Sequence, residues 1–185
     1  MAQLWVGVLM TVLVVGGCMR PGRGGVPSKP SPPAQMKALD RMVGTWTGTA
    51  ELVDPPSPDG KPKTFTGAWK TEPVLDGAAV KSAGWFEMPD GEKVHWIEYW
   101  CWDARAKKYR TSFINDWAEF GSGWAQDCGR CNGFCVSGRS VNADGMKTRK
   151  DGCVILVDDD TTNWWFTAKS RQGKMTVRGT SKRQK

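Results

Sequence analysis

The chain has 185 residues, enough for one domain of ordinary size with a buried core, and too few for a large multidomain protein. Eleven Trp stand against two Tyr, and 22 Gly with 11 Pro indicate many turns. The formal net charge of +7 is concentrated near the C-terminal end, in seven basic residues without an acid: Lys169, Arg171, Lys174, Arg178, Lys182, Arg183 and Lys185. This stretch is typical of a solvated strand face running into a basic tail, although anionic lipid or nucleic acid could also bind it.

The first segment, residues 1–17, is apolar and uncharged. It is shorter than the roughly 20 apolar residues of a membrane span and is typical of a secretory signal. The run Val15-Gly16-Gly17-Cys18 resembles the bacterial lipobox, in which small side chains let the peptidase cleave beside a thiol that has just been acylated. The resemblance implies a lipoprotein attached to a membrane through Cys18. The alternative is an uncleaved anchor, and either arrangement places the domain in an oxidising compartment outside the cytoplasm.

Residues 18–34 are rich in Pro, Gly and Ser and contain almost no side chain that could join a core. This composition predicts an extended, mobile tether that holds a domain away from its membrane. Residues 35–43 are the one good helical stretch, because apolar residues recur near helical spacing from Met36 to Val43. We expect one short helix there, at the start of a domain that covers residues 35–185.

From Trp46 onward, short runs are separated by turn residues, a pattern typical of an antiparallel β domain. The expected strands are 46–53, 64–75, 79–88, 94–103, 108–116, 120–126, 133–141, 146–157, 162–170 and 174–182. Asp76-Gly77 and Asp90-Gly91 are hairpin dipeptides, and residues 54–62 and 142–145 are rich in turn residues. Ten meandering strands with no second helix favour an all-β fold, a closed antiparallel barrel, because closure removes exposed sheet edges.

A resemblance to a known family covers the chain from about Met36. The start, MKALDRMVGTWTGTAEL, resembles the opening of lipocalin-like (calycin) barrels, in which a short helix leads into Gly-x-Trp on the first strand. More closely, the chain resembles a bacterial family of unknown function within that superfamily, through Trp102-Asp103, Lys108-Tyr109 and the Gly173-Lys174 start of a Thr- and Arg-rich last strand. The resemblance implies a ten-strand barrel with an internal cavity and no established activity.

The segment VHWIEYWCWD, residues 94–103, is the most informative strand. Alternation puts Val94, Trp96, Glu98, Trp100 and Trp102 on one face, and His95, Ile97, Tyr99 and Cys101 on the other. If the tryptophan face points inward, the pKa of Glu98 rises unless a cation lies beside it. Trp69 and Phe65 share a parity on an earlier strand and could line the same cavity. We predict a ligand site formed by Trp69, Trp96, Glu98 and Trp100; the alternative is that these side chains fill the barrel.

Five cysteines remain besides Cys18. Cys128, Cys131 and Cys135 are close enough in sequence to suggest a zinc site or an iron–sulfur cluster. However, no second pair of ligands at zinc-knuckle spacing follows. Disulfides are the first interpretation for an exported protein. Cys135 and Cys153 are about equally far from the turn at 142–145, so we expect them to pair, and Cys128 to pair with Cys131 across a two-residue bend. Cys101 should then be the free thiol.

The sequence contains no recognisable catalytic cluster, so we expect no enzyme. The only His is His95, and no His lies near the end of the chain, so we predict no haem or other cofactor. Asp158-Asp159-Asp160 lacks the alternating ligands and the glycine of a calcium loop, so a hairpin turn is the preferred interpretation and no metal site is predicted.

Three classes of function remain, in order of preference. The first is an exported, lipid-anchored protein facing the periplasm or cell exterior that binds a small apolar ligand in its barrel. The second is a non-catalytic envelope interaction module that docks its basic C-terminal face on anionic lipid or a partner. The third is an enzyme. We expect no specific nucleic-acid partner.

Overall fold

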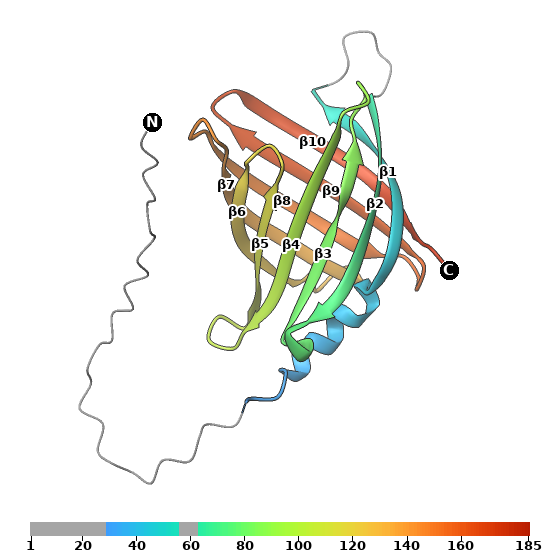
Figure 1. Cartoon of the computed structure of the whole chain (residues 1–185), viewed down its shortest axis with the longest axis vertical. Coiled ribbons are helices and arrows are strands. Elements are labelled where there is room, and N and C mark those ends of the chain that lie inside the picture. The colour runs from blue at the N-terminus through green and yellow to red at the C-terminus, as the bar shows by residue number, and fades with distance from the viewer. Residues whose placement is uncertain (1–28, 56–62) are drawn as a thin grey trace, which may run out of the picture. The chain divides into compact units, whose positions relative to one another are not determined.

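The computed structural model describes residues 29–55 and 63–185. The proposed signal, the lipobox with Cys18 and most of the tether therefore lie outside the described residues. The expected all-β barrel with one short helix before its first strand is confirmed (Figure 1). The elements are the 3₁₀ helix η1 (Ala34–Met42), β1 (Gly44–Asp54), β2 (Lys63–Val74), the 3₁₀ turn η2 (Leu75–Gly77), β3 (Ala79–Glu87), β4 (Lys93–Asp103), β5 (Lys108–Asn115), β6 (Phe120–Asp127), β7 (Gly133–Val141), β8 (Lys147–Leu156), β9 (Thr161–Ser170) and β10 (Gly173–Arg183).

Each strand pairs with its neighbours in sequence, always antiparallel, and β1 closes the barrel by pairing with β10. The predicted strand ends lie within two residues of the observed ones. Two local details differ from expectation. The helix is 3₁₀ throughout, and Asp76-Gly77 forms a turn of 3₁₀ helix in which Leu75 and Asp76 both have a φ of 53°.

Five inward-facing aromatic rings lie directly across from glycines on neighbouring strands. The pairs are Trp69 with Gly84, Phe86 with Gly67, Phe113 with Gly121, Trp164 with Gly179 and Phe166 with Gly152. A Cβ atom at Gly121 would lie 2.2 Å from the Phe113 ring, and one at Gly84 would lie 2.4 Å from the Cβ of Trp69. Four of these rings, those of Phe86, Phe113, Trp164 and Phe166, lie against the barrel wall over the opposed glycine, a pairing that supports glycines in sheets. The Trp69 ring instead reaches Gly48, where an added Cβ atom would lie 3.0 Å from it.

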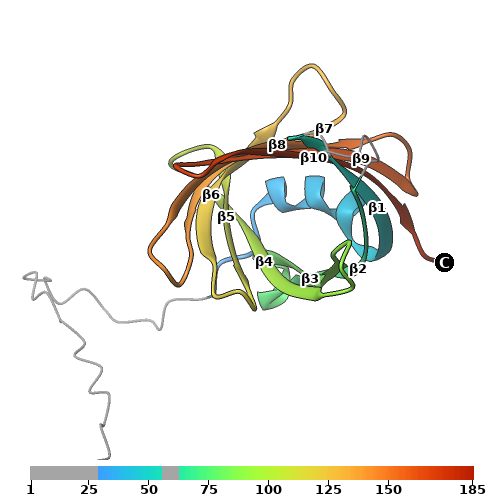
Figure 2. The same cartoon turned by 90° about the horizontal axis from the view of Figure 1, so that it is seen from above.

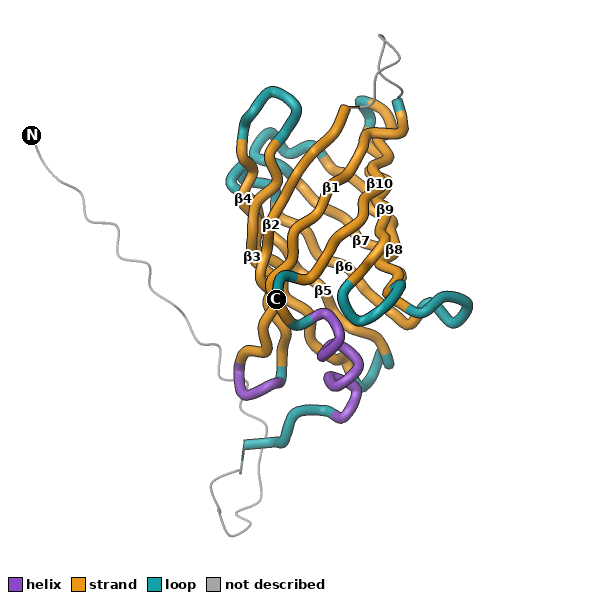
Figure 3. The backbone as a smooth tube through the Cα atoms, turned by 90° about the vertical axis from the view of Figure 1, so that its right-hand side faces the viewer, coloured by secondary structure: helices purple, strands orange, loops and turns teal. Residues whose placement is uncertain are grey.

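Helix η1 covers one end of the barrel, as the two side-on views show, and it lies across the ring of strands in the end-on view (Figures 1, 2 and 3). Its Met36 and Leu39 are buried against the ends of several strands. The resulting end core consists of Met36, Leu39, Val80, Trp100, Tyr109, Ala125 and Phe134. Tyr109 also donates its hydroxyl hydrogen to the Gln35 carbonyl at 2.7 Å. The amphipathic pattern of η1 is thus used to seal this end.

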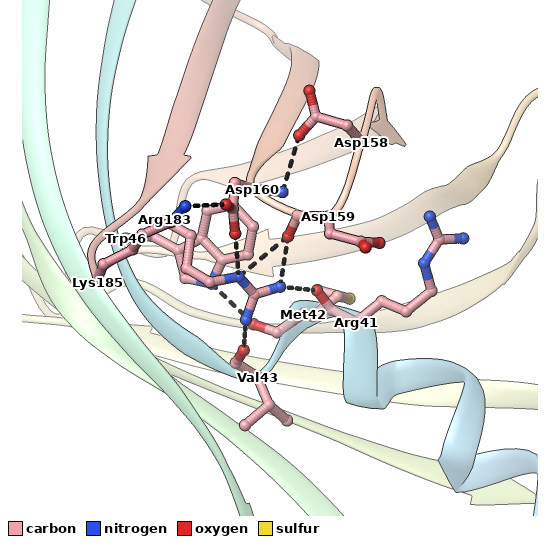
Figure 4. A network of polar contacts seen from close by, with 9 residues as sticks. All are labelled: Arg41, Met42, Val43, Trp46, Asp158, Asp159, Asp160, Arg183 and Lys185. Carbon is pink, nitrogen blue, oxygen red and sulfur yellow. Dashed lines mark hydrogen bonds and ion pairs between the residues drawn. The ribbon is translucent and has the colours of Figure 1, made fainter.

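Arg183 joins the end of β10 to three other parts of the chain at the helix end (Figure 4). Its guanidinium donates to the backbone carbonyls of Arg41, Val43 and Asp159 and forms an ion pair with Asp160. It also lies over the ring of Trp46, 4.6 Å from the centroid, and the Trp46 indole donates to the Met42 carbonyl. The turn at 158–160 therefore helps to hold the last strand to the helix and to the first strand.

Two disulfides join the pairs expected from the sequence, Cys128 with Cys131 and Cys135 with Cys153. Cys135 and Cys153 are directly opposed in the β7–β8 ladder, with Cα atoms 4.1 Å apart. Cys101 is a free, exposed cysteine on the outer face of β4.

Candidate functional site

Strand β4 directs Trp96, Glu98 and Trp100 into the barrel, because alternate residues of a strand point to opposite faces. Glu98 is directly opposite Ser82 on β3 and Phe113 on β5. Ser82 is buried and exchanges a hydrogen bond of 2.9 Å with Thr71 on β2. The carboxyl group thus lies on an inner wall that contains both polar and aromatic side chains.

An aromatic cluster lies on one side of Glu98. Phe86 stacks on Trp96 with centroids 6.0 Å apart, and Trp69 contacts both rings at 5.9 and 6.4 Å. Phe86 also contacts Trp164 at 6.1 Å. In the strand order, β3 and β9 are separated by β2, β1 and β10, so this last contact crosses the interior of the barrel.

Trp100 lies on the other side of Glu98 and belongs to a different group of rings. It is 3% exposed and packs against Phe134 at 5.8 Å and Tyr109 at 6.3 Å, within the end core. Of the four residues proposed for the ligand site, Trp69 and Trp96 are therefore in contact, whereas Trp100 packs toward the helix end. Glu98 lies between the two aromatic groups.

Burial raises the pKa of Glu98 to about 7, and the nearby Trp100 indole and Lys150 ammonium groups each oppose part of that rise. The side chain is surrounded by the barrel wall and yet is only half-buried by its accessible surface. A carboxyl group with this pKa changes its protonation state near neutral pH.

Two indole N–H groups beside Glu98 have no acceptor. Within the described residues, Nε1 of Trp96 and Nε1 of Trp100 are buried and complete no hydrogen bond. The Trp100 N–H is close enough to Glu98 to lower the pKa of the carboxyl group, but it does not meet the geometry of a hydrogen bond. Buried donors without partners are rare, and each requires an explanation.

A second polar group inside the barrel was not predicted from the sequence. Lys150 on β8 lies 2.8 Å from Glu119, and its ammonium group lies 4.2 Å from the centroid of the Phe113 ring. Burial would raise the pKa of Glu119, but hydrogen bonds from Lys150 and Ser140 outweigh it and hold that pKa below its ordinary value. Lys150 is thus engaged by Glu119 rather than by Glu98. Alternation along β8 could have indicated that Lys150 faces the interior, because it lies two residues before the buried Gly152.

A family model described as "Protein of unknown function (DUF1579)" matches residues 31–176, which include the helix and nearly all of the barrel. The chain belongs to the DUF1579 family. No curated protein matches it.

Two solved structures have folds similar to that of this DUF1579 chain. Rv2717c from M. tuberculosis has a TM-score of 0.63 and 11% identity, with 84% of this chain and 100% of that chain covered. The S-type phycobiliprotein lyase CPES from Guillardia theta has a TM-score of 0.55 and 11% identity, with coverages of 80% and 92%. At such identities the likeness shows the barrel fold alone.

Of the basic residues near the C-terminal end of the DUF1579 chain, Lys169, Lys174, Arg178 and Lys182 are exposed on the outer face of β9 and β10, spread along the strands. Strand β10 runs the length of the barrel, so its two ends lie at opposite ends of the molecule. Lys174 begins the strand and lies 2.6 Å from Asp54, whereas Arg183 is held in the network at the helix end. His95 points outward and pairs with Asp116 at 3.1 Å.

Proposed function

We propose that this DUF1579 protein binds a small, largely apolar molecule inside its barrel. Trp96 and Trp100 would donate their indole hydrogens to an acceptor on the ligand, and Glu98 would supply a further polar contact. The observation that carries the proposal is the presence of two buried indole N–H groups without acceptors on either side of a buried carboxyl group. A ligand that supplies an acceptor would remove the energetic cost of those donors.

The aromatic lining supports an apolar ligand. Trp69, Phe86 and Trp96 form a continuous ring surface next to Glu98. Phe166 faces the interior, since it lies over Gly152 and contacts Trp164, but it remains 38% exposed. Apolar walls with a few polar groups are the usual composition of a small-molecule site.

Prodan, an uncharged naphthalene ketone, tests the proposal because it combines an apolar body with one acceptor. We expect saturable binding that quenches tryptophan emission. Trp96→Phe, which keeps an aromatic ring but removes the N–H donor, should weaken binding about fivefold, the value of one neutral hydrogen bond. Glu98→Gln should change the pH dependence of binding more than its strength.

Trp124→Phe is the matched control, because Trp124 lies on the outer face, where Arg110 covers its ring at 4.5 Å. The Trp124→Phe variant should bind Prodan with the same affinity as the unmodified chain. Unsaturable binding, or equal loss in Trp96→Phe and Trp124→Phe, would rule out the interior site.

We also propose that the protein is exported and attached to a membrane by lipid on Cys18. The lipobox-like sequence supports this proposal, and the two disulfides are consistent with an oxidising compartment. Among the described residues, no helix is long and apolar enough to cross a bilayer.

A second candidate function, docking on anionic lipid, is favoured by a row of cations on the outer face. Arg139, Arg149, Lys169 and Lys174 are exposed and directly opposed across β7, β8, β9 and β10. Like charges in directly opposed positions destabilise a sheet. Asp151 and Asp54 pair with Arg149 and Lys174, but within the described residues Arg139 and Lys169 form no ion pair and lack a compensating contact. Contact with anionic headgroups would provide one.

Cys18→Ser separates the two proposals about the membrane. If lipid on Cys18 is the anchor, the variant should leave the membrane fraction at every salt concentration. Partial retention at low salt that is lost at high salt, and lost also in Arg149→Gln/Lys169→Gln, would identify the cation row as a second attachment. Full retention of Cys18→Ser at all salt concentrations would contradict both.

A further inference from the structure

The outer face of the barrel has a groove that is separate from the interior site. It has a volume of about 450 Å³ and crosses β1, β10 and β9. Its side chains include Thr49, Glu51, Asn163, Trp165, Arg178 and Thr180. These residues alternate along their strands with the inward-facing Ala50, Trp164 and Gly179, so the groove opens to solvent on the outside.

The ladder aligns the groove residues in two neighbouring rows. In the first row, Arg178 is directly opposite Glu51 on one side and Trp165 on the other. In the second, Thr180 is opposite Thr49 and Asn163, and its hydroxyl donates to the Asn163 side-chain oxygen at 2.9 Å. A ligand lying across the strands would therefore meet an indole, a guanidinium and a carboxylate beside hydroxyl and amide groups.

Trp165 differs from the other outward-facing strand tryptophans of the described chain. Lys93 covers the ring of Trp85 at 4.2 Å, and Arg110 covers that of Trp124 at 4.5 Å. No cation lies over the ring of Trp165 in the described chain, although Arg178 is its direct neighbour across the ladder. The indole face is thus left available for stacking, and Arg178 is available for other hydrogen bonds.

The chemistry of the groove selects among ligand classes. Among the outward-facing side chains of the groove, only Trp165 and Ile155 would offer a large apolar surface to an apolar ligand. A strongly anionic ligand would meet Glu51, and a cationic one would meet Arg178; neither side chain forms an ion pair within the described residues. A neutral ligand with several hydroxyl groups and one apolar face fits all of them, since each polar side chain can exchange hydrogen bonds with hydroxyls and the indole can pack against the apolar face.

We propose that this groove is a saccharide-binding site, in which one sugar ring stacks on Trp165 and its hydroxyl groups bond to Arg178, Glu51 and Asn163. Neutral oligosaccharides exposed at a cell surface are the class of ligand that it would take. The site is independent of the interior, because none of these side chains faces Glu98.

Titration of the ¹⁵N-labelled protein with tri-N-acetylchitotriose, cellotriose and maltotriose tests the proposal. At least one of the three sugars should move the indole N–H resonance of Trp165 saturably, with Kd near or below about 1 mM. The indole resonances of Trp96 and Trp124 should stay in place. Trp165→Ala should weaken binding at least about tenfold, as expected for an aromatic anchor, and Trp124→Ala is the matched control that should not.

Arg178→Gln provides a second variant that does not depend on the loss of an aromatic ring, and it should weaken binding severalfold. If Trp165→Ala fails to fold, the sugar affinity of Arg178→Gln decides whether the proposal holds. The proposal is overturned if none of the three sugars gives a saturable shift of the Trp165 resonance, or if Arg178→Gln binds as tightly as the unmodified chain. Glu98→Gln should leave sugar binding unchanged, which keeps this test separate from that of the interior site.

Discussion

Glu98→Gln should raise the free energy of unfolding by about 3 kcal/mol above neutral pH and leave it nearly unchanged near pH 4. The pKa of Glu98 is raised from 4.5 to about 7 in the folded protein, and one unit corresponds to about 1.4 kcal/mol. Between those two values the unfolded carboxyl group is ionised while the folded one keeps its proton. Stability therefore falls as pH rises from about 4.5 to 7, and the full cost remains above pH 7.

Gln resembles the protonated carboxyl group but cannot ionise, so the stability of the variant should not fall between pH 4.5 and 7. Urea unfolding followed by tryptophan fluorescence, with the disulfides intact, measures the difference across the pH range. The exposed, outward-facing Glu51 provides Glu51→Gln as the control for the substitution itself. A constant gap between Glu98→Gln and the unmodified chain at every pH would show that Glu98 does not ionise in a buried environment.

Trp100→Ala should lower the free energy of unfolding by about 3–5 kcal/mol, the usual cost of removing a large ring from a packed core. Trp100 is 3% exposed, and its neighbours Tyr109, Phe134 and Leu39 belong to the end core beneath the helix. The neighbouring backbone is held in the β-ladders, so it can collapse only partly into the space left behind.

The matched comparison is Trp124→Ala, which removes the same side chain from the outer face and should cost about 1 kcal/mol or less. Chemical denaturation of both variants at one pH gives the two values. If their losses are equal, then the ring of Trp100 does not contribute to a packed core, and its role would be confined to the proposed ligand site.

Much of the barrel could be predicted because the sequence features that specify its strands and turns are local. Turn dipeptides such as Asp90-Gly91 separate the strands, and alternation within residues 94–103 correctly assigns Trp96, Glu98 and Trp100 to one face. The turn at 142–145 sets the register that opposes Cys135 to Cys153. These features depend only on residues that are near one another in sequence.

Contacts across the interior could not be predicted in this way. Alternation shows which face a ring occupies, but the tilt and stagger of the strands decide which rings meet. For that reason Trp100 joins Phe134 rather than Trp69, Phe86 reaches Trp164 from the opposite wall, and Lys150 meets Glu119. The two ends of β10 likewise separate cations that are close in sequence.

The pairing of β1 with β10 has a consequence for the order in which the barrel can assemble. Strand β1 can pair with β2 early, but its second edge stays open until residues 173–183 have been made and delivered. Arg183, which fastens the helix end, is the last residue of β10. A chain that leaves the ribosome with its N-terminal end first thus stays an open sheet until β10 has emerged, and such long-range closure is slow compared with local pairing. Closure of the barrel thus depends on β10, the strand that pairs with β1 and β9.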